Sequence, residues 1–280
     1  MTETSETTGT TAPVVAMLNQ KGGVGKTTLT VQLGGLLASR GWDVLAVDLE
    51  PEGALTSILG FDDVYGDLDQ PVTLHDLLLD PQSHADHAGD LVLEGPEFDL
   101  LPAHEKMVDN TASALEGEPK ARERLGMALD TLRDDYDAIL VDNEPSINVL
   151  TDNALRNSDG VVIPTYAEGL SIQGLDRLQK QIASIEEYYG PVNVLALVIN
   201  RIEHNKQAEA MVQSLRDGFG EHLPVVEIRK RVALQRSLVQ EGVSVVAADE
   251  ETDMLPHLED LAGVVERELL PESRPVVGDE

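Results

Sequence analysis

Cysteine is absent from this chain of 280 residues, and its absence excludes two kinds of site. No disulfide can form, and no thiolate can hold a metal ion or an iron–sulfur cluster. No apolar run approaches the roughly 18–20 residues that a membrane-spanning helix needs. Residues 1–12 are rich in Thr and Glu and lack the basic start and apolar centre of a signal peptide. We therefore expect a cytoplasmic protein with a disordered tail over residues 1–12.

Basic residues are also scarce. The chain has 20 Lys and Arg against 51 Asp and Glu, which gives a formal net charge of -31. Such a chain repels itself in dilute buffer, whereas molar salt shortens the Debye length to about 3 Å and screens the repulsion. Because the acids are spread along the whole chain, the composition favours a halophilic protein from a salt-rich cytoplasm. An ordinary acidic protein is the alternative.

Short apolar runs alternate with helical patterns along the chain. This alternation is typical of a parallel sheet that is covered by helices on both faces. We therefore predict a three-layer α/β/α fold with a mostly parallel, twisted sheet. The predicted strands are residues 14–18, 43–49, 98–103, 136–143, 160–165, 192–200 and 223–228. The predicted helices include residues 27–39, 172–188 and 206–219.

The segment between the second and third predicted strands lacks a clear pattern. Residues 60–97 are acidic and rich in turn residues, which predicts a surface excursion with one short helix over residues 74–79. No linker composition divides the chain. We therefore predict a single domain over residues 13–270, followed by an acidic tail over residues 271–280.

A glycine-rich loop, MLNQKGGVGKTTL, joins the first predicted strand to the first predicted helix. We expect the backbone N–H groups from Gly22 to Lys26 to form a concave anion site at the helix N-terminus. Lys26 is then expected to reach the β- and γ-phosphates of a nucleotide, and the Thr27 hydroxyl is expected to bind Mg²⁺. The general pattern G-x-x-x-x-G-K-[ST] is broken, because Gln20 replaces the first glycine and Lys21 follows it. The predicted nucleotide contacts are Lys21, Gly22, Gly23, Val24, Gly25, Lys26, Thr27 and Thr28.

Several segments together resemble one known family. KGGVGKTT (residues 21–28) resembles the deviant Walker A box of the ParA/MinD ATPases, and VDLEPEGALTSILG (47–60) resembles their V-D-x-D-P-Q-G-x-x-T segment. YDAILVDNEPSINVLTDNAL (136–155) resembles their Walker B segment, and VIPTYAEGLSIQGL (162–175) resembles the strand and helix that follow. The similarity extends from about residue 14 to 246. It implies a P-loop ATPase that binds ATP and Mg²⁺ and is closest to the ParA (Soj-like) members.

The resemblance also gives the second lysine a role. In this family the first lysine of the box, here Lys21, crosses a dimer interface to the phosphates of the partner's ATP. Such a cation neutralises charge on the transferring phosphoryl group, and an arginine finger of this kind gives roughly 10³–10⁵ in rate. The nucleotide would then control dimerisation. The alternative is that Lys21 adds to phosphate affinity within its own subunit.

Two aspartates are predicted at the carboxyl edge of the sheet, where α/β sites gather. Asp142 matches the Walker B position and is expected to hold Mg²⁺ through water, and Asp48 matches the first aspartate of the family's D-x-D segment. A helix cap is the alternative for each. We assign Lys21, Lys26, Asp48, Glu50 and Asp142 as catalytic residues and Thr27, Asp48 and Asp142 as metal site residues.

Two residues depart from the family pattern. Glu50 stands where the family has an aspartate that is thought to orient the attacking water, and it reaches about one CH₂ further. A misplacement near 1 Å can cost on the order of a hundredfold in rate. Glu144 replaces a proline. It either adds negative charge near the γ-phosphate or, as we favour, points to solvent as one more surface acid.

Two further contacts are predicted from the last strands. Asn200 is our candidate for adenine contact, with a cap on the next helix as the alternative. The segment RKRVALQR (residues 229–236) has four basic residues and no acid. The matching region of ParA relatives contributes to nonspecific DNA binding, and the alternative is pairing with nearby acids or with the nucleotide. The candidate contacts to DNA phosphates are Arg229, Lys230, Arg231 and Arg236.

The resemblance implies three partners: a second copy of the chain, nonspecific DNA and a ParB-like adaptor that stimulates ATP hydrolysis. The cargo would be a plasmid, a chromosome or a protein cluster, and the ATP-bound protein would associate with the nucleoid. A membrane-positioning MinD-like role is the weaker alternative, because residues 249–280 are acidic and their apolar helical face is expected to pack on the sheet. A second alternative is an ATP-switched DNA-binding scaffold with negligible turnover, which Glu50 favours.

Overall fold

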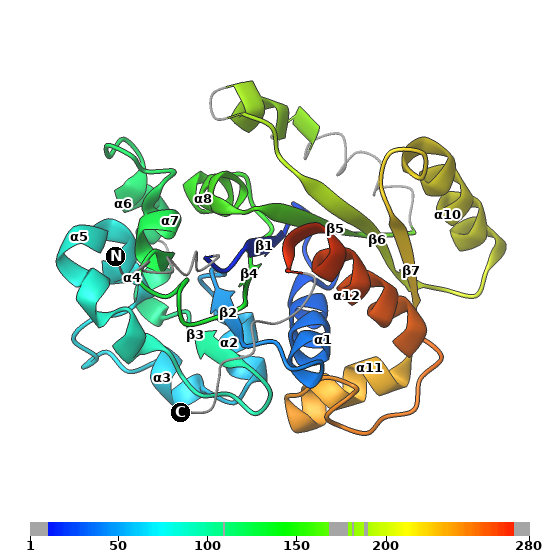
Figure 1. The fold of residues 1–280 in the computed structure, drawn as a ribbon, viewed down its shortest axis with the longest axis horizontal. Coiled ribbons are helices and arrows are strands. Elements are labelled where there is room, and N and C mark those ends of the chain that lie inside the picture. Colours follow the sequence, from blue (N-terminus) through cyan, green and yellow to red (C-terminus); the bar gives the residue numbers. More distant parts are fainter. Residues whose placement is uncertain (1–10, 109, 168–178, 181, 188–189, 272–280) are drawn as a thin grey trace, which may run out of the picture.

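The structure is a computed structural model, and it describes residues 11–108, 110–167, 179–180, 182–187 and 190–271. The tails predicted over residues 1–12 and 271–280 fall almost entirely outside this part of the chain, as does most of the helix predicted over residues 172–188. The described residues are organised around one parallel sheet (Figure 1).

The sheet has seven strands in the order β3-β2-β4-β1-β5-β6-β7, and every neighbouring pair is parallel. Each strand overlaps one of the seven predicted apolar runs, so the predicted fold class is confirmed. The strands are β1 Val14–Met17, β2 Val44–Asp48, β3 Asp99–Leu101, β4 Ala138–Asp142, β5 Gly160–Tyr166, β6 Val194–Ile202 and β7 Val225–Arg229.

Helices fill the connections between the strands (Figure 1). The helix predicted over residues 206–219 is observed with both ends as predicted. The helices are α1 Lys26–Ser39, α2 Ala54–Ile58, α3 Asp62–Tyr65, α4 Leu74–Leu79, α5 Pro81–His84, α6 Thr111–Leu115, α7 Arg124–Leu129, α8 Val149–Asn157, α10 Lys206–Phe219, α11 Val232–Arg236 and α12 Leu255–Leu269.

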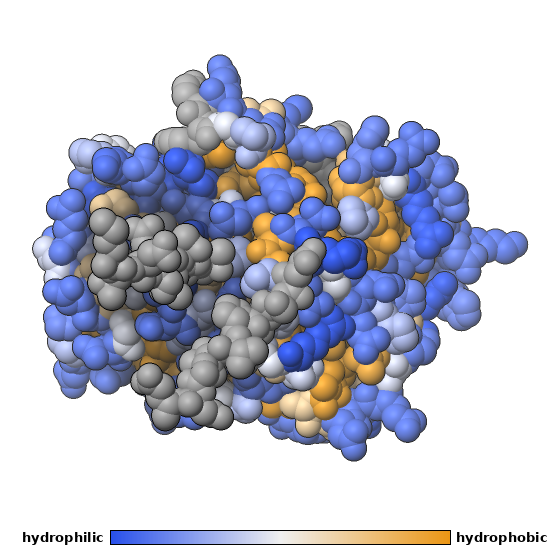
Figure 2. Space-filling view, in the orientation of Figure 1, coloured by the Kyte–Doolittle hydropathy of each residue, from blue (hydrophilic) through white to orange (hydrophobic). Residues whose placement is uncertain are grey.

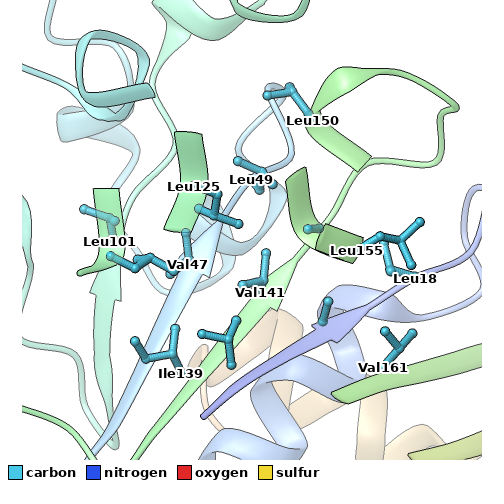
Figure 3. Packing of buried hydrophobic residues seen from close by; sticks show 14 of the residues in the cluster. Leu18, Val47, Leu49, Leu101, Leu125, Ile139, Val141, Leu150, Leu155 and Val161 are labelled. Carbon is cyan, nitrogen blue, oxygen red and sulfur yellow. The ribbon is translucent and has the colours of Figure 1, made fainter. Parts of the chain in front are cut away.

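The two faces of the sheet have separate cores because successive side chains of a strand point in opposite directions. On β2, Leu45 and Val47 belong to the same core as leucines of α4, α7 and α8. Figure 3 shows Val47 in this core with Leu125 of α7 and Leu155 of α8. Val44 and Ala46 belong to the opposite core, with α1 and α12. These two helices lie side by side along that face (Figure 1). The three predicted layers are therefore present.

The prediction for residues 60–97 was right for the short helix over residues 74–79, which is α4, but wrong in treating the segment as a surface excursion. This segment contains α3, α4 and α5 and two short 3₁₀ turns, and it contributes to the core of one face. Leu74, Leu77 and Leu78 of α4 are buried, because their spacing places all three on one face of the helix. The helix itself was predicted, but the many acids around it suggested a surface location, whereas its leucines belong to the core.

The surface is dominated by hydrophilic residues on the face seen in Figure 2. Among the described residues, no helix combines the length and the apolar character that crossing a bilayer requires. The apolar face of α12 is buried, and Leu258, Leu261 and Val265 on it are each at most 1% exposed. This confirms the prediction that the C-terminal apolar stripe packs on the sheet.

Candidate phosphate-binding site

The functional residues predicted from the motifs meet at the carboxyl edge of the central strands. Asp48 and Asp142 end neighbouring strands and lie opposite each other in the register of β2 and β4. Met17, the last residue of β1, is also opposite Asp142. The glycine-rich loop that follows β1 therefore begins beside both carboxylates, as the sequence predicted.

Side chains from β6 and from the start of the loop fix the loop backbone. Asn19 donates to the Pro164 carbonyl at 2.7 Å and accepts from the Lys21 N–H at 2.9 Å. Asn200 donates to the Val24 carbonyl at 2.9 Å. A Cβ at position 25 would lie 2.2 Å from the Asn200 side-chain nitrogen, and this residue has φ of +95°, so only glycine fits. The loop is thus preformed for an anion at the start of α1.

Lys26, the first residue of α1, lies among carboxylates. It is only 6% exposed. Burial lowers the pKa of its ammonium, whereas the charges of Asp142, Glu50 and Glu144 raise it. A buried cation in the first residue after the glycine loop is suited to bind a polyphosphate.

Asp142 is fully buried and poorly satisfied. Burial and the charge of Asp48 raise its pKa well above the usual range, and the nearby Thr27 hydroxyl lowers it again. Within the described residues, neither carboxylate oxygen has a partner at hydrogen-bonding geometry. Buried carboxylate oxygens without a protein partner are suited to bind a cation or water. Thr27 and Asp142 are a donor set that fits Mg²⁺, which takes few protein ligands and keeps several waters. The described chain contains no cluster of three or more His, Cys, Asp or Glu side chains for a metal.

Asp48 differs from Asp142 because its oxygens are occupied. One oxygen accepts from the Thr56 N–H at 2.8 Å and from the Thr56 hydroxyl at 2.7 Å, and the other accepts from the Glu50 N–H at 3.3 Å. Burial raises its pKa to about 7. The helix-capping alternative therefore describes the contacts of Asp48, which holds the first turn of α2. Its contribution to the metal site stays a prediction.

The two glutamates that depart from the family pattern both face this site. Glu50 is half-buried. Burial raises its pKa, and the charge of Lys26 opposes this effect. The charges of Glu52 and Glu144 raise the pKa further, so the net shift is upward. Glu144 is also half-buried, and it accepts from the Asn148 side chain at 2.7 Å. The prediction that Glu144 is a solvated surface acid was therefore wrong. Asn148 caps α8, and its contact keeps Glu144 beside the site.

Lys21 lies over an aromatic ring that the sequence did not single out. Its ammonium is 4.8 Å from the centroid of the Tyr166 ring. Arg201 donates to the Tyr166 hydroxyl at 2.8 Å and lies 5.4 Å from the same ring. The position of Tyr166 at the end of β5, on the edge that carries the loop, was the signal that could have identified it.

Asn200 contacts the loop rather than the next helix. It is 4% exposed within β6. The helix-capping alternative was wrong, because Asn205 caps α10 by accepting from the Ala208 N–H at 2.9 Å. Contact with adenine stays a prediction. A cavity of about 330 Å³ beside Tyr166 and Arg201 is lined in part by Lys230.

The basic segment follows β7 at the same edge of the sheet. Arg231 makes two hydrogen bonds of 2.6 Å to the Asp253 carboxylate. Arg236 forms a similar two-fold contact with Glu250. The structure thus contains the pairing with nearby acids that was the alternative for this segment. Arg229 and Lys230 line a cavity of about 430 Å³, and DNA contact by any of the four stays a prediction.

Known proteins resemble the chain in sequence and in structure. A family model described as an AAA domain matches residues 12–193. An uncharacterized protein of Mycobacterium tuberculosis is 36% identical over 197 residues, which are 69% of this chain and 59% of that protein, so the chain spans less than two thirds of that relative. The chromosome partitioning protein ParA of Caulobacter vibrioides is 32% identical over 230 residues, covering 80% of this chain and 83% of ParA.

A solved structure with the same fold contains a nucleotide. Cobyrinic acid a,c-diamide synthase from Mycobacterium smegmatis, with bound ATP analogue and magnesium, superposes with a TM-score of 0.72. It is 25% identical, and the superposition covers 91% of this chain and 95% of that one. A likeness of this kind shows that the fold accommodates a nucleotide with magnesium in another protein.

Proposed function

The chain belongs to the ParA/MinD family of P-loop ATPases, and from this premise we propose that it is a ParA-type partition ATPase that hydrolyses ATP with Mg²⁺. One observation carries the proposal. At the edge of the sheet a preformed glycine loop, the buried ammonium of Lys26 and the unsatisfied carboxylate of Asp142 face one another. Each supplies what a magnesium–triphosphate complex needs.

The proposed roles follow from this geometry. The loop N–H groups and Lys26 would bind the phosphates, and Thr27 and Asp142 would hold Mg²⁺, which would neutralise negative charge on the triphosphate. Thr28, the third residue of α1, is the last of the proposed nucleotide contacts in this segment. Glu50 orients the attacking water through its carboxylate. Asp48 fixes the loop that carries Glu50, because it accepts from the Glu50 N–H.

We further propose that ATP joins two copies of the chain through Lys21. In this family the equivalent lysine reaches the partner's nucleotide, and here the Lys21 ammonium lies over the Tyr166 ring. ATP is then part of the interface, and hydrolysis separates the subunits. The dimer would retain nonspecific DNA, with Arg229 and Lys230 as contacts, and a ParB-like adaptor would stimulate turnover. The relative named for chromosome partitioning supports this role.

The test is Lys21→Ala, assayed in concentrated KCl. We expect the variant to bind ATP within a fewfold of wild type, to remain monomeric with ATP and Mg²⁺ in size-exclusion chromatography with light scattering, and to lose about 10³ in turnover. Weakened ATP binding with normal dimerisation would instead support the alternative that Lys21 acts within its own subunit.

A second candidate function rests on Glu50. The longer carboxylate favours an ATP-switched DNA-binding scaffold that turns over slowly, if at all. Turnover at background in concentrated KCl, with and without DNA and an adaptor, would support the scaffold. A MinD-like membrane role has less support, because the apolar face of α12 is buried.

A further inference from the structure

The loop that carries Glu50 must be placed accurately if the longer side chain is to replace an aspartate. This loop, residues 50–53, follows β2 and closes with a hydrogen bond of 2.9 Å from the Gly53 N–H to the Glu50 carbonyl. Gly53 has φ of +67°, a conformation that suits glycine. The backbone of these four residues therefore decides where the Glu50 carboxylate lies.

Tyr65, from α3, holds this loop from outside the nucleotide site. Its hydroxyl donates to the Pro51 carbonyl at 2.9 Å. Its ring lies directly on Gly53, because a Cβ at position 53 would be 2.5 Å and 2.6 Å from two ring carbons. Pro51 and Gly53 are both buried, although Glu50 and Tyr65 are half-exposed. One side chain thus fixes the loop at two points immediately after Glu50.

The chain just after Tyr65 is anchored by the segment that follows β3. His104, which is 2% exposed, donates from Nε2 to the Asp67 carbonyl at 2.9 Å. The ring nitrogen Nδ1 accepts from the Lys106 N–H, which assigns the proton to Nε2. The preceding residue, Ala103, donates from its N–H to the Thr56 hydroxyl, the same hydroxyl that binds Asp48. The segment after β3 therefore contacts Thr56, which follows the Glu50 loop, and Asp67, which follows Tyr65.

We propose that Tyr65 is a positioning residue for Glu50: its hydroxyl and ring hold the loop at residues 51 and 53 so that the glutamate carboxylate reaches the place of the attacking water. The proposal rests on the proposed ATPase function. It assigns no contact between Tyr65 and the nucleotide. A loss of Tyr65 therefore affects the chemical step and leaves ATP binding unchanged.

The first test is Tyr65→Phe, which removes the hydroxyl and keeps the ring over Gly53. We expect kcat to fall about tenfold, because a misplacement of 1 Å costs roughly a hundredfold and the remaining ring contact should limit the displacement. The KM for ATP should change by less than twofold. The matched control is Tyr136→Phe, which removes a hydroxyl that donates to Asp99 at 2.8 Å on β3. A Tyr65→Phe variant with wild-type kcat would overturn the proposal.

A double-mutant cycle separates positioning from general destabilisation. In a Glu50→Gln background the orienting carboxylate is already absent, so Tyr65→Phe should cause no further loss of kcat. An equal loss in both backgrounds would overturn the proposal.

A readout that is independent of turnover distinguishes this inference from the proposed function. Amide hydrogen exchange over residues 50–55 should quicken at least fivefold in Tyr65→Phe and stay unchanged in Tyr136→Phe, whether or not ATP is hydrolysed. If the wild type shows no turnover, the proposed hydrolysis fails and the exchange result alone decides. Unchanged exchange at residues 50–55 would overturn the positioning role.

Discussion

The glycine loop before α1 and the basic segment after β7 lie at the same edge of one sheet, yet they differ in how the structure uses their charges. The ammonium of Lys26 is buried and faces carboxylates that belong to the site. The guanidinium groups of Arg231 and Arg236 are at the surface, where Asp253 and Glu250 neutralise them. A spaced motif specifies geometry, whereas a charged composition specifies only charge, which neighbouring residues can cancel.

The largest expected effect tests the buried side of this comparison. Lys26→Ala should weaken ATP binding more than 100-fold, because it removes the buried cation and leaves Asp142 and Glu50 without their opposing charge. Titration calorimetry with ATP and Mg²⁺ measures the loss. Lys21→Ala is the matched control, since it removes the other lysine of the loop and should retain binding. Equal losses for both lysines would contradict the distinct roles.

The acids of the two regions should respond to pH with opposite sign. Burial raises the pKa of Asp48 from 3.8 to about 7, so between these values the folded chain binds more protons than the unfolded chain. Its contribution to the free energy of unfolding is therefore fully present below pH 3.8 and falls as pH rises to 7, by up to about 1.4 kcal/mol per pH unit. At the basic segment, the arginines lower the pKa values of Asp253 and Glu250. Their contribution is present above the unfolded pKa and is lost as pH falls.

The measurement is the free energy of unfolding by denaturant between pH 4.5 and 7.5, without nucleotide and in concentrated KCl. Asp48→Asn should remove the part of the slope that Asp48 supplies. Asp253→Asn should leave this window unchanged, because both pKa values of that exposed acid lie at or below 3.8. A slope that is the same in wild type and Asp48→Asn would show that Asp48 titrates normally in the folded chain.

The same contrast explains what the sequence could predict. The seven strands and the loop followed from apolar runs and glycine spacing, which are local signals, and the register then brought Asp48 opposite Asp142. The contacts that fix the loop were not predictable. Asn200 reaches Val24 across 176 positions, and Thr56 joins Ala103 to Asp48 across 47 and 8 positions. Such contacts depend on the path of the folded backbone, and no period of 2 or 3.6 residues encodes them.

The acids that pair with Arg231 and Arg236 were not predictable from the sequence either. Asp253 and Glu250 lie 22 and 14 positions from their partners, in a chain where acids are common everywhere. Counting charges identified the basic segment, but only the folded structure shows that half of its cations are already paired. Arg231 and Arg236 can contact DNA only if DNA phosphates displace Asp253 and Glu250 from them.

The smallest expected effect tests whether DNA can displace these acids. Neutralising both acids with Glu250→Gln and Asp253→Asn releases Arg231 and Arg236 toward DNA phosphates, so DNA affinity in the presence of ATP should rise a fewfold. The slope of log affinity against log salt should steepen by up to about 2, because each new phosphate contact releases about one counterion. The control is Glu259→Gln with Asp260→Asn on α12, which changes the net charge equally at exposed positions outside the basic segment. An equal gain in both variants would mean that only the overall charge matters, and no gain in either would remove Arg231 and Arg236 from the DNA interface and leave Arg229 and Lys230 as its candidates.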